Sequence, residues 1–554
     1  MKNKKNLWIL ILIITLGFFF RLIGFNWDQG QHLHPDERFL SMVINDIEIP
    51  KTLSEYLDPK TSSLNPYNNK YGFFVYGSLP INLVKIISQI LNFSEYDHAY
   101  LIGRSLTIIL DSLVILLVFF VTSKIANQKT ALIASFLYSI SVLPIQLSHF
   151  FTVDPFFNFF IILSFCSLIS LQNKKNQFKN TIFLSLCFGF ALASKISAVF
   201  FAPVILLFFI FNFKKDLLSF FKYGFIFLFF SICIFRFSQP QVFTDANYFN
   251  WQLNPQFIQN IKELKTWDKN PYYPPSIQWI KTTPIVSPLK NIILWGLGLP
   301  FGIIFLISII YTIKKINQSK NKLVLFLILF WILFLFLYQG SQSVTTMRYF
   351  LPIYPFICIL SATIINVFFN SIFIKKNIIF KYLLYLSLIF YPLMFISIFF
   401  KNHSRVDASS WIYKNIPLGS TIATEYWDDA LPLSIKSDSS SFYQYQSIHI
   451  ADIEDVYPSK INMIKNQLNQ SDYYILSSNR FYKPIPKNFD IFPKTTKLYQ
   501  SLFDGSLGYQ KVAEFSSYPC FPPVGKSWFC LNDDSSEEAF TVYDHPKVLI
   551  FKKY

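Results

Sequence analysis

The sequence predicts a polytopic α-helical membrane protein that carries a C-terminal α/β domain outside the membrane. Of its 554 residues, 52% are hydrophobic and 19% are aromatic, which excludes a disordered or coiled-coil protein. The apolar residues are gathered in runs of the length that crosses a bilayer, about 20 residues. From about residue 401 the composition becomes polar, rich in Ser, Asp, Tyr and Pro.

Eleven apolar runs are predicted to span the membrane. The first run, in "MKNKKNLWILILIITLGFFFRLIGF", resembles a signal peptide, but its length and the lack of a small-residue cleavage site favour a retained helix. The fifth and sixth runs are short and are joined through "ASKIS", so the boundary between them is the least defined. The predicted spans are 7–25, 100–122, 131–150, 156–172, 181–194, 196–213, 219–237, 289–313, 323–338, 349–369 and 378–400.

Lysines predict how these spans are oriented. The chain has a formal charge of +17, and about eighteen lysines but one acidic residue fall in "MKNKK", "SKIANQK", "QNKKNQFKN", "NFKKDLLSFFK", "IKKINQSKNK" and "IKKNIIFK". With eleven spans, all six segments lie on the cytoplasmic side, as the positive-inside rule requires. The charge is thereby explained by topology, and nucleic acid is not expected as a partner. We therefore expect a multi-pass cell-membrane protein with a cytoplasmic N-terminus and an extracytoplasmic tail.

The same topology divides the chain into two expected domains, a membrane domain 1–400 with outer loops 26–99 and 238–288, and an extracytoplasmic domain 401–554. In the first loop, "YGSLPINLVKIISQIL" is amphipathic and is expected to lie at the outer interface without spanning. In the tail, "DASSWIYKNIP" predicts a helix, "STIATEYW" and "DYYILSS" predict buried strands, and "FTVYDHPKVLIFKK" predicts a closing hairpin.

Two acidic motifs occur on the predicted outer face. "HLHPDERFL" places Asp36 and Glu37 beside His34, directly after the first span, and "SHFFTVDPFF" places Asp154 five residues after His149. Each motif alone is also typical of a helix start, where acidic side chains favour the helix dipole. Helix capping requires no second acidic motif at the same membrane face, so the pair favours a shared site.

Three cations are expected at the same face. Arg104 in "YLIGRSLTIIL", Lys195 in "ALASKISAVF" and Arg348 in "TTMRYFLPIYPF" lie at outer ends of predicted spans, against the positive-inside bias. Any one of them could snorkel to the headgroups. Together with the acidic motifs they suit transfer of a sugar from a polyprenyl phosphate. The cations stabilise the leaving phosphate, and a carboxylate takes the proton of the attacking hydroxyl.

The motifs also resemble those of a known superfamily. The arginine-bearing end of the first span followed by "HPDE", then "SHFFTVDPFFNFF", "GFALASKISA" and "MRYFLPIYP", is similar in order to the protein O-mannosyltransferases and aminoarabinose transferases, which have the GT-C fold. The similarity covers roughly residues 7–370. "PPSIQW", "TPIVSPLKNIILWGLGLP" and "ASSWIYKNIP…EYWDDALP" resemble a bacterial subgroup of family-39-type glycosyltransferases.

This resemblance implies roles for individual residues. It implies that Asp36 is the catalytic base of an inverting in-line displacement, that Glu37 is a substrate-binding acid, and that Asp154 is the acid of the second outer loop. Arg104, Lys195 and Arg348, with His34 and His149, are implied to bind the lipid phosphate and the sugar. The donor would be a polyprenyl-phosphate hexose such as mannose. The tail differs from that of the mannosyltransferases, so the resemblance does not carry over the acceptor, which is expected to be an extracytoplasmic protein, lipid or glycan.

The sequence leaves two alternative functions, a lipid-linked-sugar flippase or transporter and a non-catalytic membrane subunit of glycan assembly. A transporter is expected to carry ionisable residues at mid-membrane, and the predicted spans offer almost none except Asp111. A divalent cation held by His34, His149, Asp36 and Asp154 is a further alternative, although a monophosphate donor does not require a metal.

The sequence contains six cysteines. Cys166, Cys187, Cys233 and Cys358 lie in apolar runs and are expected to be inert. The remaining two occur in "YPCFPPVGKSWFC" of the tail, where an extracytoplasmic location permits a disulfide that the turn "FPPVG" could close.

Overall fold

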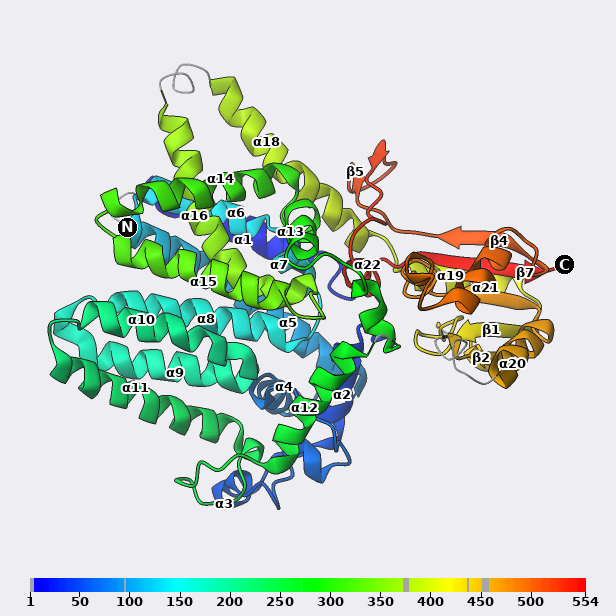
Figure 1. Cartoon of the computed structure of the whole chain (residues 1–554), viewed down its shortest axis with the longest axis horizontal. Coiled ribbons are helices and arrows are strands. Elements are labelled where there is room, and N and C mark those ends of the chain that lie inside the picture. Colours follow the sequence, from blue (N-terminus) through cyan, green and yellow to red (C-terminus); the bar gives the residue numbers. More distant parts are fainter. Residues whose placement is uncertain (1–3, 94–95, 271, 372–377, 436–437, 451–457) are drawn as a thin grey trace.

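A computed structural model describes residues 4–93, 96–270, 272–371, 378–435, 438–450 and 458–554. Long helices lie side by side in one body, and an α/β domain is attached at one end of it (Figure 1). The predicted fold class, a polytopic helical membrane protein with a C-terminal α/β domain, is confirmed.

Most of the predicted spans coincide with long helices. In the described ranges, eight helices are long and apolar enough to cross a membrane, or nine if α6 and α7, which meet at a 54° bend, are one span. The predicted spans 181–194 and 196–213 fall on α9 and on the shorter apolar stretch Ile196–Asn212, so the count of eleven stays a prediction. The helices are α1 (Lys4–Leu22), α5 (Tyr96–Ile125), α6 (Gln128–Ser139), α7 (Val142–Ser148), α8 (Val153–Ser170), α9 (Gln177–Ser194), α10 (Ala202–Asn212), α11 (Leu217–Ser238), α14 (Leu299–Lys315), α15 (Lys322–Gly340), α16 (Tyr354–Asn370) and α18 (Ile378–Phe395).

Short polar turns join these helices at the end of the bundle that faces away from the sheet. The start of α1 and the turns α8–α9 and α10–α11 lie at this end, on the left of Figure 1. Side chains cap the helices there: Asn127 accepts the backbone N–H of Thr130 (3.0 Å), and Asp216 accepts that of Ser219 (3.0 Å). These described turns and the C-terminal domain therefore occupy opposite ends of the molecule.

Shorter elements cover the other end of the bundle. They are α2 (Pro35–Asp46), α3 (Leu53–Leu57), α4 (Ser78–Ile90), α12 (Pro255–Lys269), η5 (Pro274–Trp279) and η8 (Met347–Ile353). The amphipathic segment forms α4, whose 13 residues extend about 20 Å, too short for a hydrocarbon core of about 30 Å. Figure 1 shows α2, α4 and α12 lying across the direction of the long helices.

The C-terminal domain is built on a five-stranded mixed sheet. Its strands β1 (Thr421–Glu425), β2 (Gln444–Ile448), β3 (Tyr473–Leu476), β4 (Tyr509–Phe515) and β7 (Val548–Lys553) have the order β2-β1-β3-β7-β4. β1 pairs in parallel with β2 and β3, whereas β7 runs antiparallel to β3 and β4. Helices α19 (Ser404–Asn415), α20 (Pro458–Asn469) and α21 (Pro493–Phe503) accompany it. The predicted helix and both predicted strands of the tail are present.

One local prediction in the tail is wrong. "FTVYDHPKVLIFKK" is not a hairpin, because it contains the end of α22 (Glu538–Thr541) and then the single strand β7. Between them the buried His545 contacts Asp544 (2.5 Å) and Asp533 (2.8 Å). This ionic cluster fixes the connection as a buried turn, and β7 finds its partners in β3 and β4 instead.

The two tail cysteines are joined. A Cys520–Cys530 disulfide links β5 (Cys520–Phe521) to β6 (Phe529–Cys530). The other four cysteines are free and buried, as predicted.

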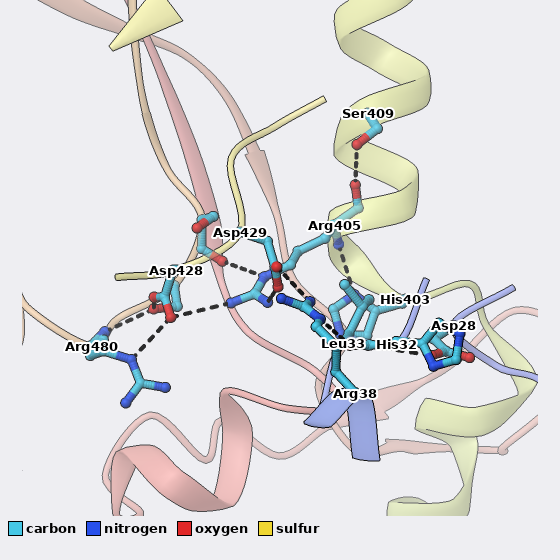
Figure 2. A network of polar contacts seen from close by, with 12 residues as sticks. Asp28, His32, Leu33, Arg38, His403, Arg405, Ser409, Asp428, Asp429 and Arg480 are labelled. Atoms are coloured by element: carbon cyan, nitrogen blue, oxygen red, sulfur yellow. Dashed lines mark hydrogen bonds and ion pairs between the residues drawn. The ribbon is translucent and has the colours of Figure 1, made fainter. Parts of the chain in front are cut away.

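A polar network attaches the C-terminal domain to α2. Arg38 of α2 donates to Asp429 (2.6 Å), which also accepts from Arg405 of α19 (2.7 Å). Arg480 donates to the adjacent Asp428 (3.0 Å), and Figure 2 shows these side chains converging. The domain is thereby held directly over the helix that begins with the "HPDE" motif.

Candidate functional site

A hollow lies where the helical bundle meets the C-terminal domain. It is a cavity of about 250 Å³. His34, Asp36 and Tyr76 line it from the first outer loop, and Arg348 lines it from η8. The second outer loop contributes Leu264, Trp267, Asp268, Tyr273, Gln278 and Trp279, and the C-terminal domain contributes Trp427, Arg480, Glu537, Phe540 and Tyr543. Four segments far apart in the sequence thus enclose one space.

Asp36 is the acidic centre of this cavity. Pro35 opens α2 and places Asp36 in its first turn, where the helix dipole favours a carboxylate. Its Oδ2 accepts from Arg348 Nη1 (2.5 Å) and its Oδ1 from the Tyr76 hydroxyl (3.0 Å). Burial opposes ionisation, but Arg348 and then His34 outweigh it and lower the pKa of Asp36 to about 2. Asp36 is therefore a carboxylate at neutral pH.

A second ion pair lies beside the first. Lys195 Nζ donates to Asp154 Oδ1 (2.7 Å), and the Lys195 ammonium lies 4.7 Å from the centre of the Tyr349 ring. The Arg348 guanidinium lies 5.5 Å from the same ring. About a quarter of each cationic side chain is exposed. Two partly accessible cations therefore flank one tyrosine at the mouth of the bundle.

The predicted roles of Glu37 and Arg104 require a correction. Both side chains are fully buried, and Arg104 donates to both oxygens of Glu37 (2.5 and 2.9 Å) and of Asp28 (2.9 and 3.0 Å). Its fifth N–H donates to the Phe25 carbonyl (3.1 Å). Because all five guanidinium donors are used, Arg104 has none left for a phosphate. The pair packs α5 against α2 behind the cavity.

The two histidines also separate. His34 lines the cavity between the rings of Phe150 and Tyr543, each 4.5 Å away, and burial lowers the pKa of His34 to about 4. His149 lies away from the cavity lining. Its ring nitrogens are each 2.8 Å from a backbone carbonyl, of Ile145 and Ile23, which is a packing role.

The alternative metal site is not assembled. Within the described parts of the chain, no three His, Cys, Asp or Glu side chains are grouped to hold a metal ion. Of its four proposed ligands, His149 is engaged by backbone and Asp154 by Lys195.

Several residues of the cavity escaped the sequence-based prediction. Tyr76 holds Asp36, and Arg480 and Tyr543 come from the tail. Glu537 Oε1 accepts the Met347 backbone N–H (2.7 Å), directly before Arg348. No local motif marks these residues, and the only signal is the pair of glutamates in "SSEEAF", which precedes a short apolar run.

Asp111, the one predicted acid at membrane depth, has partners. Its Oδ2 accepts from Arg21 Nε (2.6 Å) and its Oδ1 from the Tyr138 hydroxyl (2.5 Å). Buried charges are tolerated when they are paired and hydrogen-bonded. This cluster joins α1, α5 and α6, and Asp111 is a structural residue of the bundle.

Known proteins share the fold described above. Residues 83–236 match the sequence model of the dolichyl-phosphate-mannose-protein mannosyltransferase family. The oligosaccharyltransferase of Archaeoglobus fulgidus in complex with Zn and sulfate has a TM-score of 0.55 at 12% identity over 98% of this chain and 88% of its own. Its complex with an inhibitory peptide and a dolichol-phosphate gives 0.54 at 12% identity over 100% and 89%.

ArnT from Cupriavidus metallidurans bound to undecaprenyl phosphate gives a TM-score of 0.46 at 10% identity over 98% of this chain and 97% of its own. No curated protein matches the chain in sequence.

The fold thus places the chain among membrane proteins with the GT-C fold. The predicted resemblance to the protein O-mannosyltransferase superfamily is confirmed, with the sequence match confined to residues 83–236.

Proposed function

We propose that the chain is a membrane glycosyltransferase that moves a sugar from a polyprenyl-phosphate donor to an extracytoplasmic acceptor. The observation that carries the proposal is the ion pair of Asp36 and Arg348 at the wall of an outer cavity. It brings a candidate base and a candidate phosphate ligand into direct contact, at the level where the bundle ends.

Each charged group has a chemical task in this proposal. Arg348 and Lys195 would contact the phosphate of the lipid and stabilise the charge that develops as the sugar leaves. Asp36 would accept the proton of the attacking acceptor hydroxyl. The proton moves to the Asp36 carboxylate, the new glycosidic bond forms at the anomeric carbon, and the sugar–phosphate bond breaks to leave a polyprenyl phosphate.

Binding of the donor would also activate the base. Arg348 holds the pKa of Asp36 at about 2, which makes its carboxylate a weak base. A donor phosphate that draws Arg348 toward itself removes that charge from Asp36, whose burial then raises its pKa. Asp36 becomes a stronger base only when the donor is in place, which disfavours activation of a hydroxyl without a sugar to receive it.

The comparisons support the donor class. One structural relative was solved with a dolichol-phosphate and an inhibitory peptide, and the family model names a dolichyl-phosphate-mannose enzyme. By analogy, we propose a lipid monophosphate as the carrier here. A hexose such as mannose is the proposed sugar, and a protein, lipid or glycan is the proposed acceptor.

The test is Asp36→Asn, because an amide keeps the start of α2 but cannot take a proton. The protein in liposomes would receive a panel of synthetic polyprenyl-phosphate sugars, with membranes of the host as acceptor source. We expect sugar transfer to fall by about 10²–10⁴-fold with normal insertion.

Asp46→Asn is the matched control, since Asp46 ends the same helix and binds Tyr71 (2.6 Å) outside the cavity. Transfer by Asp36→Asn at the wild-type rate with saturating donor would contradict the assignment of the base.

A further inference from the structure

A second pocket adjoins the candidate catalytic cavity on the side of the C-terminal domain. Its volume is about 210 Å³. Lys281 and Thr282, which follow η5, form one wall, and Lys483, Lys487 and Asn488 around η12 (Ile485–Asn488) form the other. Three lysines from two distant segments therefore surround one hollow.

Two of these lysines have no ion-pair partner among the residues that the structure describes. Lys281 forms an ion pair with Asp490. Lys483 Nζ is buried and has no hydrogen-bond partner among the described residues. Lys487 is exposed and forms no ion pair within the same part of the chain. A buried ammonium without a partner is unfavourable, and burial accordingly lowers the pKa of Lys483.

The acidic residues around these lysines are already engaged. Asp534, the acidic group that acts most on Lys483, accepts from Lys547 Nζ (3.0 Å). Glu537 lines the pocket, and its Oε1 accepts the Met347 N–H (2.7 Å). Glu538 borders the pocket, but its carboxylate lies 3.2 Å from Arg480 Nη2 and accepts from Gln278 Nε2 (2.6 Å). Lys483 and Lys487 thus remain for an anion that enters the pocket. The Thr282 hydroxyl and the Asn488 amide nitrogen already donate to the backbone carbonyls of Trp279 (2.8 Å) and Pro484 (2.9 Å). This composition suits a phosphate or carboxylate group, which lysine binds as a point charge.

The pocket shares part of its lining with the cavity that contains Asp36. Gln278 and Glu537 line both spaces. Glu537 accepts the N–H of Met347, so its backbone partner is the neighbour of Arg348. A molecule anchored in the pocket can therefore extend past Glu537 toward the Asp36 carboxylate.

We propose that this pocket is a binding site for an anionic group, a phosphate or a carboxylate, carried by the acceptor. This inference rests on the proposed function, because only a glycosyl transfer has an acceptor. The proposed donor phosphate is assigned to Arg348 and Lys195 at the end of the bundle, whereas the lysine pocket is built by the second outer loop and the C-terminal domain. An anion bound here leaves the donor position free and orients its remaining hydroxyl groups toward the cavity.

The test measures binding of inorganic phosphate to the full-length protein in dodecyl maltoside, which contains no phosphate. Isothermal titration calorimetry would be done on a variant with Arg348→Gln and Lys195→Gln, which lacks both cations assigned to the donor, and on the same variant with Lys483→Gln and Lys487→Gln. We expect phosphate affinity to fall at least tenfold when Lys483 and Lys487 are replaced. Lys511→Gln, on the exposed face of β4 and paired with Glu514 (2.8 Å), is the matched control and should bind like its parent.

Equal affinity with and without the two lysines would overturn the proposal, while the proposed glycosyl transfer, tested by Asp36→Asn, would stand or fall separately. Repetition in nanodiscs that contain phosphatidylglycerol identifies the source of the anion. If the lysine-dependent phosphate binding disappears there, a lipid headgroup fills the pocket; if it persists, the anion belongs to an acceptor that is not a bilayer phospholipid.

Discussion

At the scale of single residues, the site is governed by how each charge is compensated. Asp36 and Arg348 neutralise each other at a distance of 2.5 Å, yet both retain exposed surface in the cavity. Arg104, in contrast, is closed within a shell of acceptors. Both arginines precede apolar segments at the same face. They differ in the number of guanidinium N–H groups that have no acceptor within the protein, and this number distinguishes a candidate phosphate ligand from a structural cation.

The Asp36–Arg348 pair predicts how the rate of transfer depends on pH. Because the pKa of Asp36 is about 2, the base is ionised from neutral pH downward to about pH 4, and kcat/KM of the wild type should have no acidic limb in that range. In Arg348→Gln, burial of Asp36 remains and its main opposing charge is lost, so its pKa rises and an acidic limb moves to higher pH. The measurement is kcat/KM of the residual activity between pH 4 and 8.

Arg348→Lys is the control, because it keeps the charge and should keep the limb at low pH. A profile that is identical in wild type and Arg348→Gln would show that Arg348 does not set the ionisation of the base.

The residue types of the site could be predicted from the sequence better than their roles. The "HPDE" motif identified Asp36, and the outward cation of "MRYF" identified Arg348, which do meet in the cavity. Glu37 and Arg104 satisfied the same criteria, but they form a buried network with Asp28. Sequence shows that a charge is at the membrane face; whether it has a partner depends on side chains from other elements.

At the scale of elements, α2 assigns successive residues to different surroundings. Successive helical residues are about 100° apart, so Asp36 faces the cavity, Glu37 the bundle and Arg38 the C-terminal domain. One turn of helix thereby links the proposed base, the packing of the bundle and the contact with the C-terminal domain. Displacement of α2 should disturb all three at once.

The Glu37–Arg104–Asp28 network predicts a stability effect that separates its two possible roles. Arg104→Gln leaves two buried carboxylates without their cation and should destabilise the protein by about 3–5 kcal/mol, measured as a lower unfolding temperature in detergent. Arg38→Gln is the control. More than a third of the Arg38 side chain, which pairs with Asp429, is exposed. The Arg38→Gln substitution should therefore lower the stability by only about 0–1 kcal/mol.

Adding Glu37→Gln to Arg104→Gln should restore part of the loss, because one uncompensated charge is removed. If Arg104→Gln unfolds like the wild type and only raises KM for the donor, Arg104 binds the lipid phosphate after all.

At the scale of the whole molecule, hydropathy predicted the bundle, since apolar runs depend on local sequence, while the domain boundary near residue 401 stays a prediction from composition. The closure of the site could not be predicted in this way. Gln278, Arg480 and Glu537 reach the cavity through contacts between the second outer loop and the tail, more than 200 residues apart. The wrong hairpin has the same cause, because β7 pairs with strands that begin 75 and 39 residues earlier.

The topology proposed for the whole chain has a direct test in cysteine labelling from outside the cell. The positive-inside rule places the lysine-rich turns in the cytoplasm, and the structure places them at the end of the bundle opposite the sheet (Figure 1). Cysteines introduced at the exposed positions Lys60, Gln259 and Ser441 should react with a membrane-impermeant maleimide, whereas cysteines at the equally exposed Asn176 and Gln318 should react only after the membrane is permeabilised.

The buried native cysteines should add little background in intact cells. External labelling at Gln318 with none at Gln259 would show that the bundle has the opposite orientation in the membrane. Asp36 would then face the cytoplasm, where nucleotide sugars are available, and the proposal of an outer-face lipid donor would have to be abandoned. Labelling at all five positions in intact cells would mean leaky membranes, which a cytoplasmic marker protein measured in parallel would reveal.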